Sequence, residues 1–243
     1  MPLRQYDRKQ LLKITADDVE WPLTDPEVVH LFSAFEAYWC HNYEAAELGR
    51  LGFHAILPSG FHGDGFFLSE PVLKHPNLRR LMASQLAMKY KSLCRMRPTR
   101  VIGVPNGATG LGIELAAEME VDFGELVKTG DSFALKNPLR RGEILLLAED
   151  FCHGATNLEE GMKVCLATQP DVVFTQYQMV ILNCGGRSTV CVNGKHCGLA
   201  SLATPRTNKW RKANCTLCHK GSVPLDPKEN KENWKKLLTG QLH

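Results

Sequence analysis

Apolar residues in the central part of the chain follow two spacings, one typical of helices and one typical of buried strands. Residues 77–90 carry apolar side chains every three or four positions, as a helix with one buried face requires. Continuous apolar runs at 101–104 and 143–148 predict buried strands, and the patterns at 111–119 and 157–164 predict a helix after each. Short apolar runs at 172–174 and 179–182 predict further strands. This alternation predicts an α/β fold with a mostly parallel central sheet flanked by helices.

The two ends of the chain have different patterns. Residues 1–50 read as helical, with a turn at Pro22 and Pro26 followed by an apolar stripe of Val28, Val29, Leu31, Phe32, Phe35, Tyr38 and Trp39. Glycines interrupt residues 53–67, which predicts a hairpin or looped strand. From Cys184 onward the pattern is less regular, and the charged stretch 226–236 predicts a solvated surface helix. We expect three consecutive parts: an N-terminal helical extension over 1–45, an α/β core over 46–183, and a small irregular C-terminal region over 184–243 that contains strand structure, cysteines and a charged tail.

Composition narrows the class of protein. With 243 residues, of which 44% are apolar and 23% charged, the chain can bury a full core without crosslinks. A net charge of +3 argues for neither nucleic acid nor membrane as a partner. The first residues do not resemble a secretion signal, and no apolar run approaches the roughly 20 residues of a membrane helix. The 9 cysteines therefore predict reduced thiols. We expect a cytoplasmic protein that acts on a small molecule.

The segment after the strand at 143–148 is the first candidate site. Glu149 and Asp150 leave the strand, a loop of small residues follows, and a helix opens with Thr156 or Asn157 as its N-cap. Free backbone N–H groups and the positive end of the helix dipole suit a phosphate group. The carboxylates would then hold ribose hydroxyls, with or without Mg²⁺. The alternative is an ordinary turn before a well-capped helix.

Residues 144–157 resemble the phosphoribosyl-diphosphate signature of type I phosphoribosyltransferases, an apolar strand ending in two acids and a phosphate loop. Further segments resemble the orotate phosphoribosyltransferase branch in the same order along the chain. Residues 51–67 are similar to its Ser-Gly-x-His-x-Asp-x-Phe segment, 104–110 to its diphosphate loop, and 124–141 to its mobile basic loop. Residues 215–225 are similar to the Cys-x-x-Cys-x-x-Gly tail of some members. The resemblance spans about residues 45 to 228.

The resemblance implies a type I phosphoribosyltransferase fold and a homodimer that transfers ribose 5-phosphate from phosphoribosyl diphosphate to a nucleobase, orotate above all, in pyrimidine nucleotide synthesis with Mg²⁺. The catalytic residues by this resemblance are Asp150, Glu149 and Lys128. The residues that bind the phosphates and diphosphate are His153, Gly154, Ala155, Thr156, Asn157, Asn106, Gly107, Ala108, Thr109 and Gly110. The residues near the base are Ser59, Gly60, His62, Phe66 and Phe67.

Some positions depart from the family pattern. Ala155 stands where the family has a glycine. If the loop needs a positive φ at this position, the alanine costs about 1 kcal/mol, and its methyl group would crowd a phosphate. The segment around Lys128 is poor in basic residues, and the diphosphate loop has no lysine. These changes leave a second hypothesis open: a paralogue without turnover that keeps the fold and acts as a nucleotide- or RNA-linked binding or regulatory protein.

Three other features carry weaker hypotheses. Cys215 and Cys218 have the spacing of a structural Zn²⁺ site, with Cys191, His196, Cys197 and His219 near in sequence, although an isolated Cys-x-x-Cys also occurs without metal. Cys152 beside His153 suggests a reactive thiol, against which its apolar neighbours favour a core position. The basic residues around Trp210 suggest RNA, but their density is more typical of a solvated surface; they are Arg206, Lys209, Arg211 and Lys212.

Overall fold

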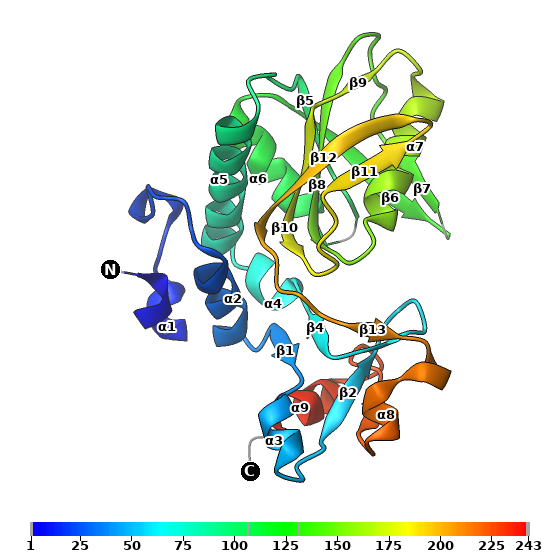
Figure 1. The fold of residues 1–243 in the computed structure, drawn as a ribbon. Helices are drawn as coiled ribbons and strands as arrows, with labels where there is room; N and C mark the ends of the chain where they lie inside the picture. The colour runs from blue at the N-terminus through cyan, green and yellow to red at the C-terminus, as the bar shows by residue number, and fades with distance from the viewer. Residues whose placement is uncertain (1, 106, 131, 242–243) are drawn as a thin grey trace. The chain divides into compact units, whose positions relative to one another are not determined.

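The computed structural model describes residues 2–105, 107–130 and 132–241, and the chain divides into two compact units (Figure 1). Unit 1 comprises Met1–Leu31 and Ser69–Pro205, and unit 2 comprises Phe32–Leu68 and Arg206–His243. Each unit is assembled from two separate stretches, whereas the sequence pattern divides the chain into three consecutive parts.

A mostly parallel sheet forms the centre of unit 1, as the sequence predicts. Its strands run in the order β11-β12-β10-β8-β5-β6-β7, with β9 paired to β8. All strands from β12 to β6 in this order are parallel, and β9 is parallel to β8, while β11 and β7 are antiparallel to their neighbours. The bounds are β5 Arg100–Gly103, β6 Asp122–Thr129, β7 Ser132–Leu135, β8 Ile144–Cys152, β9 Val173–Phe174, β10 Tyr177–Asn183, β11 Thr189–Val192 and β12 Lys195–Ala203.

Helices cover both faces of this sheet (Figure 1). Helices α5 (Pro76–Leu93) and α6 (Thr109–Met119) pack on each other and on one face, and α7 (Thr156–Thr168) lies on the other. Leu145 and Leu147 of β8 pack in the apolar cluster that contains α7 residues. Leu146 lies between them and faces the opposite side, because successive strand residues alternate. All three are fully buried, which explains the continuous apolar run.

One sequence prediction about unit 1 was wrong in detail, because strand β8 does not end at Ala148 but continues through the two acids to Cys152. The C-terminal region contains strand structure as predicted, since β12 spans Lys195–Ala203 and pairs along β10. Its small residues, such as Gly198 and Ala200, give a weak strand signal, and pairing with β10 selects the extended conformation.

The N-terminal apolar stripe is only partly helical. After the short α1 (Arg8–Leu11), helix α2 spans Asp25–Ala34. It ends there because Glu36 adopts a left-handed backbone conformation, with φ of 52°. The stripe then continues as strand β1 (Tyr38–Cys40), which pairs with β4 (Gly65–Phe67) in unit 2. The short helix α4 (Glu70–Leu73) follows in unit 1.

Unit 2 is built on a small sheet in the order β13-β3-β2-β14. Strands β2 (Phe53–Ile56) and β3 (His62–Gly63) form the predicted hairpin, β13 (Lys209–Trp210) pairs with β3, and β14 (Val223–Leu225) runs parallel to β2. Helices α3 (Tyr43–Glu47), α8 (Thr216–His219) and α9 (Lys231–Thr239) complete it. Helix α9 confirms the helix predicted in the charged tail. Within the described residues, no helix of either unit is long and apolar enough to cross a membrane.

Candidate functional site

The carboxyl ends of β5 and β8 bring the two phosphate-binding segments of the sequence analysis together. The two strands are parallel neighbours, with Gly103 opposite Ala148, and the Val104 N–H donates to the Ala148 carbonyl at 2.9 Å. The segments that leave these strands, 104–108 and 153–155, therefore start at the same edge of the sheet, where open parallel sheets bind ligands. Asn106, which the sequence analysis places in the diphosphate loop, lies outside the described residues.

Gly107 lies directly against the second acid of β8. A Cβ atom on Gly107 would stand 1.9 Å from the Asp150 carboxylate oxygen Oδ2, so only glycine fits without displacing one of the two segments. Gly103 is equally confined, since its Cβ would lie 2.2 Å from the Ala108 carbonyl oxygen. These contacts fix the loop after β5 beside Asp150. The contact unites a predicted diphosphate residue with a predicted catalytic residue.

The two acids point to opposite faces of the sheet, because they are consecutive in β8. Asp150 lies on the side of Gly107, and its Oδ1 accepts from the Phe151 N–H at 2.9 Å. Glu149 is 3% exposed, and Asn157 at the start of α7 hydrogen-bonds to its carboxyl. Its Oε2 has no hydrogen-bond partner among the described residues. An unpartnered buried oxygen is costly unless a ligand supplies a donor or a cation.

The environment of Glu149 disfavours its charged form. Burial and the nearby Asp150 carboxylate raise the pKa of Glu149 to about 8. Perturbed carboxyl groups of this kind gather at functional sites, where a ligand cation or donor restores the ionised state. The described surroundings of the Glu149 carboxyl therefore do not supply enough positive charge to stabilise its ionised form.

The phosphate loop enters α7 through a left-handed residue. Ala155 has φ of 58° and ψ of 21°, so the conformation that the sequence analysis considered is present. The prediction of Thr156 or Asn157 as N-cap was wrong: Ala155 is the N-cap, and it makes no side-chain capping bond. Ala155 is 2% exposed and packs in the apolar cluster under α7, which argues against the prediction that its methyl group crowds a phosphate. The helix N-terminus thus keeps backbone N–H groups for a ligand.

Arg187 is a loop-positioning residue that the sequence analysis missed. Its Nη1 donates to the Gly154 carbonyl at 2.7 Å, and its Nη2 donates to Glu159 Oε1 in the first turn of α7 at 3.0 Å. The Asn183 side chain holds the Arg187 backbone through bonds of 2.6 and 3.2 Å. The sequence signal was available, because Gly185-Gly186-Arg187 follows β10, the parallel neighbour of β8.

The remaining predicted residues of unit 1 lie in different settings. Lys128 is exposed near the end of β6, opposite Phe133 of β7, so the segment likened to a mobile loop contains a β-hairpin here. Thr109 and Gly110 open helix α6. Cys152 is 4% exposed and burial raises the pKa of its thiol, so the structure favours the core position over a reactive thiol.

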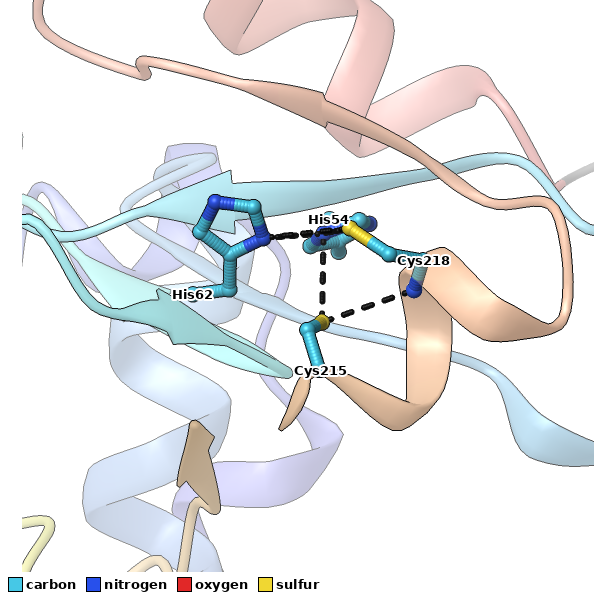
Figure 2. Close-up of side chains that lie close together, drawn as sticks. All are labelled: His54, His62, Cys215 and Cys218. Carbon is cyan, nitrogen blue, oxygen red and sulfur yellow. Dashed lines mark hydrogen bonds between the residues drawn. The ribbon is translucent and has the colours of Figure 1, made fainter. Parts of the chain in front are cut away.

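The residues predicted near the base lie in unit 2. Ser59 and Gly60 form the exposed turn between β2 and β3. The other three are buried: Phe67 stacks on Tyr38 with ring centroids 4.2 Å apart, and Phe66 packs in the apolar cluster of the unit. His62 faces His54, Cys215 and Cys218 (Figure 2). Cys191, His196 and Cys197, which are near the cysteine pair in sequence, belong to unit 1 instead.

Comparisons with known proteins support the resemblance. No protein-family model matches the chain. A curated relative, orotate phosphoribosyltransferase of Caldicellulosiruptor bescii, is 25% identical over 185 residues, which cover 74% of this chain and 90% of the relative. This relationship supports the expectation of a glycosyltransferase enzyme.

Solved structures show the same fold. The crystal structure of orotate phosphoribosyltransferase from Aeropyrum pernix matches with a TM-score of 0.53 at 16% identity, over 73% of this chain and 93% of that one. Leishmania donovani UMP synthase matches with a TM-score of 0.55 at 12% identity, over 87% of this chain and 40% of that one. With its parallel sheet, paired loops and acidic strand end, the chain has the fold of type I phosphoribosyltransferases and is similar to orotate phosphoribosyltransferases.

Proposed function

We propose that the chain transfers ribose 5-phosphate from phosphoribosyl diphosphate to a ring nitrogen of orotate. The bond from the sugar C1 to diphosphate breaks and a bond from C1 to nitrogen forms. The observation that carries the proposal is the contact of Gly107 with Asp150 at the ends of β5 and β8. It places a glycine backbone suited to diphosphate beside a carboxylate suited to ribose.

Each loop has a role in this proposal. Asp150 and Glu149 accept hydrogen bonds from the ribose hydroxyls, and the free N–H groups at the start of α7 bind the 5′-phosphate. Arg187 fixes the Gly154 carbonyl so that the loop keeps its shape. The backbone of 107–110 holds diphosphate, and the exposed Lys128 closes over it. These residues position the sugar and stabilise charge on the leaving group.

The residues present also fit Mg²⁺ bound with the substrate. Of the two acids, which point to opposite faces of the sheet, Glu149 has the unpartnered oxygen Oε2, a carboxylate oxygen of the kind that this ion prefers. When bound, Mg²⁺ would supply positive charge to balance the diphosphate. The proposal extends to a homodimer in the cytoplasm. The residues that the resemblance places near the base belong to unit 2, where Ser59 and Gly60 are exposed.

The test is calorimetric titration with phosphoribosyl diphosphate, with and without Mg²⁺, followed by assays of orotate consumption. We expect Mg²⁺-dependent binding and turnover. Asp150→Asn should reduce turnover by roughly a hundredfold or more, and Gly107→Ala by a similar factor, because its Cβ must displace the loop or the acid. Asp171→Asn is a matched control, since the Asp171 carboxylate forms an exposed ion pair with Arg141.

Two outcomes contradict the proposal. Absence of binding at millimolar phosphoribosyl diphosphate would rule out the enzyme. Turnover with adenine but not orotate in parallel assays would keep the reaction class and reject the base. Light scattering of the purified chain tests the homodimer separately.

A further inference from the structure

Four metal-binding side chains from two distant parts of the sequence converge inside unit 2 (Figure 2). They are His54 of β2, His62 of β3, Cys215 just before α8 and Cys218 within α8. Their ligand atoms all lie within 4.8 Å of one another. His54 and Cys215 are fully buried and His62 is 3% exposed. None of these residues belongs to the phosphate site of unit 1.

The separations between ligand atoms match those of a tetrahedral zinc site. His54 Nε2 lies 3.0 Å from His62 Nδ1, and the printed sulfur–nitrogen distances are 3.6 Å for Cys215 to His54, 3.4 Å for Cys218 to His54 and 3.3 Å for Cys218 to His62. With Zn–N of about 2.0–2.1 Å and Zn–S of about 2.3 Å, a tetrahedron separates its ligand atoms by roughly 3.3–3.8 Å. These four separations lie within a few tenths of an ångström of that range, and the remaining two, from Cys215 to His62 and to Cys218, do not exceed 4.8 Å.

Hydrogen bonds around the cluster direct the His54 lone pair inward. The Ser222 hydroxyl lies 3.3 Å from the Gly52 carbonyl, to which it donates, so its oxygen is left to accept from His54 Nδ1 at 3.0 Å. His54 Nδ1 then carries the proton, and Nε2 presents its lone pair to the cluster. A partner that fixes the tautomer in this way is typical of metal-binding histidines.

The cysteine pair has the local geometry of a metal-binding turn. The Cys218 N–H donates to Cys215 Sγ at 3.4 Å, which stabilises negative charge on that sulfur. On the hairpin, His62 is paired opposite Ile56, and His54 is its diagonal neighbour on the same face. Strand pairing therefore brings the two imidazoles together, and α8 presents the two sulfurs to them.

The geometry points to a structural Zn²⁺ site formed by His54, His62, Cys215 and Cys218. Four protein ligands close the coordination shell, so the ion has no open position for a substrate. Two sulfur and two nitrogen ligands in a tetrahedral arrangement select zinc among the common divalent ions. The ion ties the β2–β3 hairpin to the segment that precedes β14. In this assignment His62 stabilises unit 2 and makes no contact with the base.

The first experiment measures zinc in the full-length chain, purified without an affinity tag, by elemental mass spectrometry. We expect about one zinc ion per chain. Cys218→Ser and His62→Ala should lower the zinc content by roughly tenfold or more. His219→Ala is the matched control, because His219 is the next residue of the same helix and lies outside the cluster. Cys191→Ser controls for a thiol near a histidine, since Cys191 Sγ lies 3.6 Å from His196 Nε2 in unit 1. Both controls should keep their zinc.

A second measurement does not depend on how well the ligand variants fold. The wild-type chain is stripped of metal, thiol-reduced and titrated with Co²⁺, and the expected spectrum has tetrahedral d–d bands and thiolate-to-cobalt charge transfer. The proposal is overturned if the wild-type chain contains no zinc and takes up neither Zn²⁺ nor Co²⁺. It is also overturned if mass analysis finds a Cys215–Cys218 disulfide, or if His219→Ala loses as much zinc as Cys218→Ser.

Discussion

The two units hold their functional side chains in place by different means. In unit 1 the acids and phosphate loops lie at the ends of strands that are buried on both faces. Leu146 and Leu147 of β8, which point to opposite faces, are both fully buried. In unit 2 one apolar cluster has Trp39, Ala55, Phe66 and Leu237 as its buried members, and Phe35, Phe67 and Leu217 are buried as well. Two imidazoles and two thiols also converge there from distant segments.

The difference shows how the amount of buried apolar surface decides what else a fold needs. The apolar core on both faces of the sheet fixes the ends of its strands. The loops of unit 1 then need only close contacts between neighbouring strand ends, such as that between Gly107 and Asp150. A small domain buries too little apolar surface to order its segments alone, and disulfides or metals then contribute. Zinc in unit 2 would supply what the core supplies in unit 1.

Metal removal should have the largest effect and should act on unit 2 alone. Chelation of zinc from the full-length chain should lower the free energy of unfolding of unit 2 by several kcal/mol, on the order of 3 or more, because ligand binding and folding are coupled. Hydrogen exchange followed by mass spectrometry should show lost protection in β2 and β14 but not in β8 and β10. Unchanged protection in β2 after complete zinc loss would show that zinc does not stabilise unit 2.

The complementary experiment is a substitution in the apolar core of unit 1. Leu147→Ala removes a fully buried side chain in the central strand and should cost about 2–5 kcal/mol in the free energy of unfolding, through lost burial and a cavity. Hydrogen exchange in β8 and β10 measures that loss. The zinc content should not change, and loss of zinc in Leu147→Ala would show that the two units are not stabilised independently.

Much of unit 1 could be predicted from the sequence because its signals are local. The run Leu145–Leu146–Leu147 is long and apolar, and the acids and loop after it are consecutive in the chain. The bounds of strand β12 could not be predicted, because its small residues form a strand only when β10 pairs with them. The contact of Gly107 with Asp150 was also beyond prediction, since it depends on the neighbouring order of β5 and β8.

The zinc cluster could be predicted only in part, because its ligands come from segments that are distant in the sequence. The spacing of Cys215 and Cys218 indicated half of a site, but the sequence does not say which histidines complete it. Cys191, His196, Cys197 and His219 are nearer in sequence, whereas His54 lies 161 residues before Cys215. The sequence signal for the histidines was their position as diagonal neighbours on one face of the predicted hairpin.

The next effect concerns pH and unit 1. The pKa of Glu149 is raised from 4.5 to about 8 in the folded chain, chiefly by burial. Between these values the folded state binds a proton that the unfolded state has released, so Glu149 favours folding most below about pH 4.5 and loses this contribution as the pH rises to about 8. The free energy of unfolding should fall by on the order of 1 kcal/mol per pH unit in this range.

The variant Glu149→Gln isolates this contribution, because glutamine has the same shape and does not titrate. Denaturant unfolding at several pH values should show a shallower decline for the variant than for the wild type between about pH 5 and 8. Glu160→Gln changes a partly exposed carboxyl of α7 that pairs with Lys163, and it should follow the wild type. Parallel curves for wild type and Glu149→Gln would mean that Glu149 is ionised in the folded chain and that its site is better solvated than its burial implies.

The smallest expected effect is at Ala155, where the sequence departs from the glycine of the family pattern. Ala155→Gly relieves a left-handed conformation that costs about 1–2 kcal/mol for a residue with a Cβ. It also removes a buried methyl group worth about 0.8 kcal/mol and adds freedom to the unfolded chain worth about 0.4–1 kcal/mol. The contributions nearly cancel, so the free energy of unfolding should change by less than about 1 kcal/mol. Because the methyl group points into the core, phosphoribosyl diphosphate should bind with unchanged affinity in calorimetry. A marked gain in affinity would show that alanine does weaken the phosphate loop, and the departure would then count against efficient turnover by the native chain.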